Sequence, residues 1–192
     1  MRKPLPIILL CLLALPALAQ VKQSPDNPFS FINKRGYERT KGILLRSAEK
    51  MPEENYSFKP VDSVRTYGQI IGHLADAQYL FCSTASGDKN PGLNVEKTKT
   101  SKADLVAALK DGFAYCDKVY DAITDAAATQ TVNFFGNDMP KFAVLSINVG
   151  LNMEHYGNLV TYMRIKGIVP PTSEQGQMPA PKQDKSDTQP KK

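Results

Sequence analysis

The sequence predicts an all-α protein, a four-helix bundle, on the basis of three observations. Apolar residues recur at intervals of three to five along four long segments, which is the spacing of helices with one buried face. Proline, glycine and capping residues bound these segments. Strand patterns are scarce, and the best of them is a short extended piece at 131–135. Four helices with matching apolar faces pack as a bundle.

The first two helices are expected in the N-terminal half of the chain. We place the first at residues 28–50, because cap-forming residues precede it and Pro52 follows it. Residues 60–63 supply the next start signal. The second helix is expected from Val64 to the region 85–87, where a glycine stands.

The other two helices have their own start and stop signals. Ser101 and Asp104 have the spacing of a capping box with Asp in the acidic position, and helical spacing continues from there to Ile123. The fourth helix is expected to follow the sequence 137–140 and to end at Gly167, just before two prolines.

The connection between the second and third helices bears on topology. Residues 87–100 can stretch to roughly 46 Å, enough to run the length of the bundle, so that these two helices would be parallel. In a parallel pair Cys82 and Cys116 lie at similar depths, whereas in a tight hairpin they would be more than about 10 Å apart. We therefore predict a disulfide, Cys82–Cys116. The alternative is two small buried thiols.

The first 19 residues predict a secretory signal peptide. Two basic residues at 2–3 precede an apolar run at 5–15 and the small-residue sequence 17–19, so we expect cleavage after Ala19 and export to the periplasm or the medium. The apolar run is too short for stable membrane insertion. A retained anchor and a lipoprotein built on Cys11 are the alternatives.

The rest of the chain divides into a helical domain at 20–173 and a Pro/Lys-rich tail at 174–192, which is expected to be disordered. Loss of Arg2 and Lys3 with the signal peptide lowers the net charge from +5 to +3. The remaining lysines are scattered, so we expect no nucleic-acid partner. The expected partner is an unknown small molecule or protein, and a homodimer is left open.

Two histidines are the main candidates for chemistry. His73 and His155 lie near the middle of the second and fourth helices among apolar positions, where an imidazole needs a hydrogen-bond partner or a metal. The nearby polar side chains are Asp76, Asn152 and Asn158. A two-His-plus-oxygen metal site with Asp76 or Asn152 as helper is one interpretation, and buried, hydrogen-bonded histidines are the other. No motif predicts a catalytic residue.

Two segments resemble the DinB-like (DinB/YfiT, damage-inducible) superfamily. The first is GQIIGHLADA at 68–77, and the second is EHYGNLVTYMR at 154–164, which continues into KGIVPP at 166–171. The resemblance covers roughly residues 28–173. It implies an up-down-down-up four-helix bundle with a long crossover between the second and third helices, in agreement with the parallel arrangement inferred from the linker and the cysteines.

The resemblance also implies a divalent-metal site for zinc or nickel. Family members that bind metal use one histidine from the second helix and an HxxxH pair from the fourth. His73 matches the first ligand and His155 the last, whereas Leu151 stands at the middle position. Two of three ligands are therefore present. The implied activity is metal-dependent hydrolysis or thiol transfer, and the alternative is a non-catalytic bundle that binds a small ligand or a protein in its cleft.

Overall fold

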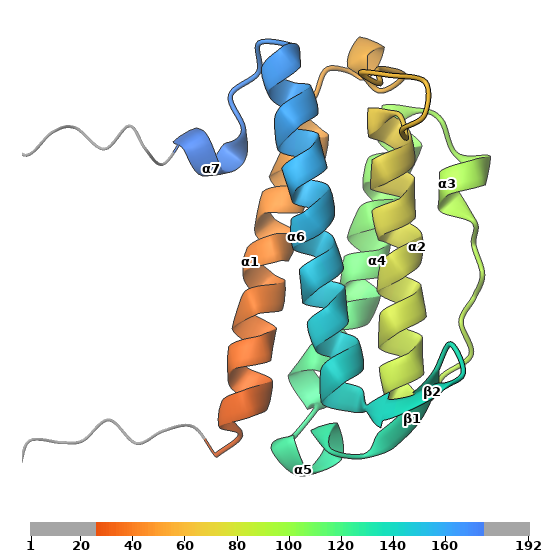
Figure 1. The fold of residues 1–192 in the computed structure, drawn as a ribbon, viewed down its shortest axis with the longest axis vertical. Coiled ribbons are helices and arrows are strands. Elements are labelled where there is room, and N and C mark those ends of the chain that lie inside the picture. The colour runs from red at the N-terminus through yellow and green to blue at the C-terminus, as the bar shows by residue number, and fades with distance from the viewer. Residues whose placement is uncertain (1–25, 175–192) are drawn as a thin grey trace, which may run out of the picture.

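The computed structural model describes residues 26–174 and confirms the all-α four-helix bundle (Figure 1). Its long helices are α1 (Pro28–Lys50), α2 (Tyr67–Ser86), α4 (Lys102–Ala122) and α6 (Lys141–Ile165). In Figure 1, α1 and α6 run upward while α2 and α4 run downward, which is the up-down-down-up order. The predicted signal peptide and residues 175–192 of the predicted tail lie outside the described residues.

The start of α2 differs from the prediction. The helix begins at Tyr67 rather than Val64, because Thr66 and Gln69 form a complete capping box. The Thr66 hydroxyl accepts a hydrogen bond from the Gln69 backbone N–H at 3.1 Å, and the Gln69 side chain accepts one from the Thr66 N–H at 2.8 Å. At the start of α4, the Ser101 hydroxyl accepts from the Asp104 N–H at 3.1 Å, as expected.

The connections contain short elements, of which the sequence predicted only the extended piece at 131–135, confirmed here as a strand. They are η1 (Glu53–Asn55), α3 (Val95–Thr98), α5 (Asp125–Ala128), the strands β1 (Thr131–Phe134) and β2 (Asn137–Pro140), and α7 (Pro171–Glu174). The two strands pair antiparallel through a tight turn at Phe135 and Gly136, whose φ angles are both positive. The sequence 137–140, expected to lead directly into the fourth helix, is thus the second strand of a hairpin. Glu174, assigned to the tail by sequence, ends α7.

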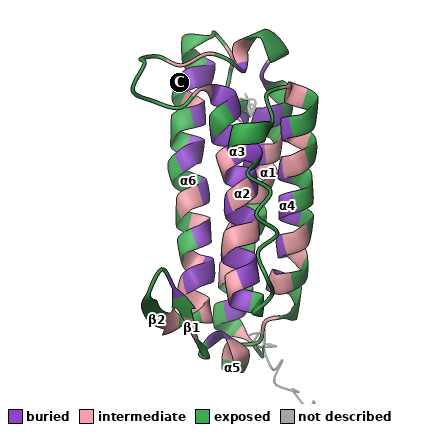
Figure 2. Cartoon of the chain, turned by 90° about the vertical axis from the view of Figure 1, so that its right-hand side faces the viewer, coloured by how far each residue is buried: buried purple, intermediate pink, exposed green. Residues whose placement is uncertain are grey.

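The parallel helices α2 and α4 form the most extensive helix pair in the bundle. Cys82 and Cys116 are fully buried between them and are joined in the predicted disulfide, with 5.4 Å between their Cα atoms. Gly112 allows this close approach, since a Cβ there would lie 3.0 Å from the backbone oxygen of Ala75. Figure 2 shows buried residues along the inner faces of the helices. None of the helices within residues 26–174 has the length and apolarity needed to cross a membrane.

Reduction of the disulfide is expected to lower the free energy of unfolding by about 3 to 4 kcal/mol, because the bond closes a 34-residue separation in the unfolded chain. Urea titration with and without dithiothreitol measures the difference. The double variant Cys82→Ala/Cys116→Ala is the control, since dithiothreitol should leave its stability unchanged. Equal stability of the oxidised and reduced wild-type protein would contradict the prediction.

Candidate functional site

The two histidines predicted as candidates lie side by side in the bundle. His73 projects from α2 and His155 from α6, and their ring centroids are 4.9 Å apart in an edge-to-face arrangement. His73 Nδ1 lies 3.1 Å from the Oε2 atom of Glu96. The fold therefore brings together the predicted pair and adds Glu96, a residue that the sequence reasoning did not find.

Glu96 connects His73 to a nearby arginine. While Oε2 contacts His73, Oε1 accepts a hydrogen bond from the Arg65 Nε–H at 2.8 Å, so both carboxylate oxygens are engaged. Burial by itself would raise the pKa of Glu96, but the hydrogen bond and charge of Arg65, together with His73, outweigh burial and lower this pKa. Glu96 is therefore a carboxylate at neutral pH.

The short helix α3 carries Glu96 and is held tightly against α2. The two carboxylate oxygens of Asp76 accept hydrogen bonds from the backbone N–H groups of Val95 and Glu96, at 2.8 and 3.0 Å. A Cβ at Gly72 would lie 2.6 Å from the Cα of Glu96, so only glycine allows this approach. Asp76, predicted as a helper ligand, acts in this structure as the cap that positions Glu96.

Asn152, the other predicted helper, belongs to a buried polar network in the core. Its Oδ1 accepts from Gln78 Nε2 at 2.9 Å, and its Nδ2 donates to the Thr40 hydroxyl at 3.3 Å. Asn148 donates to the Gln78 side chain at 3.1 Å. The network joins α1, α2 and α6 in the core, and buried polar groups need such partners. The side-chain oxygen and nitrogen of Asn152 are therefore both engaged in hydrogen bonds within the core.

His155 is neutral in its surroundings. Burial lowers the pKa of His155 below the ordinary 6.5, and the charges of His73 and Arg65 lower it further, against opposing effects of Glu154 and Glu96. The Asn158 amide nitrogen lies 3.3 Å from His155 Nδ1. With this nitrogen donating, the neutral ring accepts at Nδ1 and carries its proton on Nε2.

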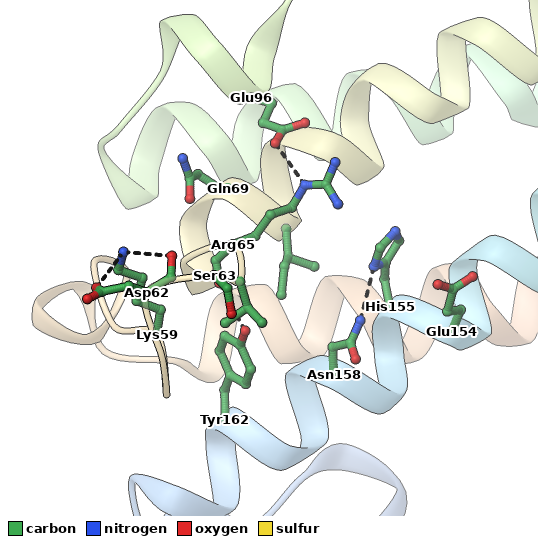
Figure 3. A pocket seen from close by; sticks show the side chains of 12 residues that line it. Lys59, Asp62, Ser63, Arg65, Gln69, Glu96, Glu154, His155, Asn158 and Tyr162 are labelled. Carbon is green, nitrogen blue, oxygen red and sulfur yellow. Dashed lines mark hydrogen bonds and ion pairs between the residues drawn. The ribbon is translucent and has the colours of Figure 1, made fainter.

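A polar cleft of about 690 Å³ opens beside His155, between α6, the start of α2 and the segment that precedes it (Figure 3). Arg65 and His155 both point into it. At the far end, Lys59 forms an ion pair with Asp62 at 3.0 Å. The Tyr162 hydroxyl donates to the backbone oxygen of Arg65 at 2.9 Å, which fixes this wall to α6.

Leu151 lines a different cavity. This second space, of about 350 Å³, has Leu151, Leu93 and Phe135 among its lining residues, and it also reaches His73. His155 lines the polar cleft instead. At the position where the family places its middle ligand, the chain thus has an apolar wall.

The residues present do not fit the three-histidine metal site that the resemblance implied. Within residues 26–174, no three His, Cys, Asp or Glu side chains are arranged to hold a metal ion. Leu151 offers no donor atom, Glu96 already binds Arg65, and the positive charge of Arg65 acts on His155. Like charges at such short range oppose the entry of a divalent cation.

Comparison with known protein families identifies the superfamily of this chain. The DinB superfamily matches residues 37–159, and the chain belongs to that superfamily.

Individual relatives agree with this assignment. The chain is 23% identical over 131 residues to the uncharacterized protein YjoA of Bacillus subtilis (strain 168), covering 66% of this chain and 84% of that protein. The crystal structure of YjoA superposes with a TM-score of 0.57 at 20% identity, over 78% of this chain and 95% of that one. A DinB-like protein from Bacillus cereus ATCC 10987 gives a TM-score of 0.64 at 18% identity, over 72% of this chain and 93% of that one.

A characterised enzyme shares the fold as well. The mycothiol-dependent maleylpyruvate isomerase superposes with a TM-score of 0.55 at 14% identity, over 68% of this chain and 59% of the enzyme. At this identity the likeness shows the fold alone.

The substitution Gly72→Ala is expected to push α3 away from α2 and to destabilise the protein by about 1–3 kcal/mol through overpacking. The matched control is Gly150→Ala in α6, where an added Cβ meets nothing within 4 Å and should stabilise the helix by about 0.5–1 kcal/mol. Urea unfolding measures both. Opposite signs are expected, and equal effects would mean that α3 does not rest on Gly72.

Stability is expected to fall as the pH drops below 6.5. The unfolded chain takes up a proton at residue 155 near that pH, whereas the folded state resists protonation down to its lower pKa, so acid favours unfolding in that window. His155→Gln should flatten the pH dependence of the free energy of unfolding in that window, because up to one proton fewer is taken up on unfolding. Urea unfolding between pH 5 and 7.5 and NMR titration of the imidazoles test this. A His155 that titrates at or above 6.5 would refute it.

Proposed function

We propose that the protein is an exported member of the DinB superfamily that binds a small polar ligand in the cleft beside His155, without the three-histidine metal centre of its metal-binding relatives. One observation carries the proposal. Next to the histidine pair, the wall of the 690 Å³ cleft is an arginine paired with a glutamate rather than a third metal ligand.

The chemistry of the cleft supports binding of a polar molecule. The lining offers a guanidinium group from the segment before α2, and a neutral imidazole and the Asn158 amide from α6, so hydrogen-bonding groups converge from two segments of the chain. Ligand sites are concave and contain a few convergent polar groups. Because Tyr162 and Asp76 hold the wall residues from behind, the cleft is largely preformed.

The second candidate function is a metal-dependent hydrolase or thiol transferase. It is favoured by the 4.9 Å separation of the histidine rings and by the contact of Glu96 with His73, which would make a two-histidine, one-carboxylate set if Arg65 released Glu96. The fold shared with the mycothiol-dependent isomerase suggests the thiol-transfer version of this candidate.

Export is part of the proposal. It is supported by the charged, apolar and small-residue organisation of residues 1–19 and by the buried Cys82–Cys116 disulfide, a bond that persists in oxidising compartments. Periplasmic fractionation of cells that express the full chain, with N-terminal sequencing of the product, checks the location and the cleavage after Ala19.

Calorimetry with zinc and nickel separates the two candidates. The wild-type protein is expected to bind neither ion stoichiometrically, whereas Leu151→His should gain at least about tenfold in affinity by supplying the missing ligand. The double variant His73→Gln/Leu151→His is the control, and it should lose the gain. Tight, stoichiometric metal binding by the wild-type protein would favour the second candidate and overturn the first.

A further inference from the structure

We infer that the ligand of this cleft carries a carboxylate group, and that the outer edge of the Arg65 guanidinium binds it. The inference rests on the proposed function and names the ligand class. Glu96 is the positioning residue that orients Arg65, and the His155 ring lines the same cleft.

Within residues 26–174, the guanidinium of Arg65 uses one of its five N–H groups in a hydrogen bond. Its Nε–H donates to Glu96, and within residues 26–174 neither terminal nitrogen forms a hydrogen bond. Those nitrogens carry four further N–H groups on a group that points into the cleft (Figure 3). A planar guanidinium matches a carboxylate through two parallel hydrogen bonds.

Contacts behind Arg65 fix the outer edge of its guanidinium group, which carries the two terminal nitrogens. Asp76 accepts a hydrogen bond from the backbone N–H of Glu96, and the Oε2 atom of Glu96 contacts His73. The backbone oxygen of Arg65 accepts a hydrogen bond from the Tyr162 hydroxyl. Since the carboxylate of Glu96 occupies the Nε side, an incoming acid meets the terminal nitrogens. Little side-chain entropy then remains to be lost on binding.

The charges around the cleft favour a single carboxylate over a phosphate. Lys59 is neutralised by Asp62, and Arg65 shares its charge with Glu96. Glu154 also lines the cleft, and it forms no ion pair with any side chain of the described region. A dianion would meet too little positive charge and would be repelled by Glu154, whereas one carboxylate needs only the Arg65 fork.

The test uses three monocarboxylates as probes, namely N-acetylglycine, hexanoate and benzoate, each beside its primary amide, together with inorganic phosphate. The chain has only two histidines, so the His155 imidazole resonances report binding by NMR. We expect at least one acid to bind about tenfold more tightly than its amide and more tightly than phosphate, because a hydrogen-bonded charge is lost in the amide.

Variants then assign the binding group. Arg65→Met should weaken binding of the acid about 10- to 100-fold and Arg65→Lys less, since lysine keeps the charge without the fork. Lys59→Met is the matched control, because it removes another cation from the same cleft, and its effect should stay within about twofold. Glu96→Gln should weaken binding of the acid but not binding of the amide. A general loss of structure would weaken binding of both. Glu154→Gln should strengthen binding of the acid.

The outcomes distinguish this inference from the proposed function. Ser63→Trp, a substitution in the cleft wall, should block every ligand of the cleft. The inference is overturned if no acid binds, if acid and amide bind equally, if phosphate binds more tightly, or if folded Arg65→Met and Arg65→Lys bind like the wild type. The proposed function fails separately if no molecule of a broad polar panel binds the wild-type protein in a manner that Ser63→Trp abolishes.

Discussion

The contact of α3 with α2 at Gly72 is the constraint on which the site depends. Because the glycine has no Cβ, the backbone of Glu96 can lie directly on the helix, where Asp76 caps it. Only from this position does the Glu96 side chain reach His73 on one side and Arg65 on the other.

The same crossover explains the topology of the bundle. Since the chain returns along the bundle before α4 begins, α2 and α4 run parallel, and Cys82 and Cys116 reach the same level. The disulfide locks the pair that carries α3. His73 therefore lies on a helix that the disulfide ties to α4, whereas His155 lies on α6, which is held by packing and by the polar network around Asn152.

The centre of this DinB bundle differs in character from a site of three histidines. An apolar residue, Leu151, forms the wall of one cavity, and an ion pair between Arg65 and Glu96 forms part of the wall of another. At the level of the histidines the bundle therefore offers an organic cation, the Arg65 guanidinium, and no donor atom at position 151. An organic cation of this kind suits recognition of an anionic group, and on this ground we infer that the polar ligand of the cleft is a small acid.

Periodicity, linker length and residue spacing are local properties of the chain, and they were enough to predict the bundle and the parallel pair with its disulfide. They also singled out His73 and His155, whose rings the fold brings to 4.9 Å. The periodicity placed the start of α2 one turn early, since Val64 fits the apolar pattern while the capping box lies at Thr66. Only the tertiary structure decided the role of Glu96. Its neighbours at the site come from two other segments of the chain, and no motif in a single segment can show a meeting created by the fold.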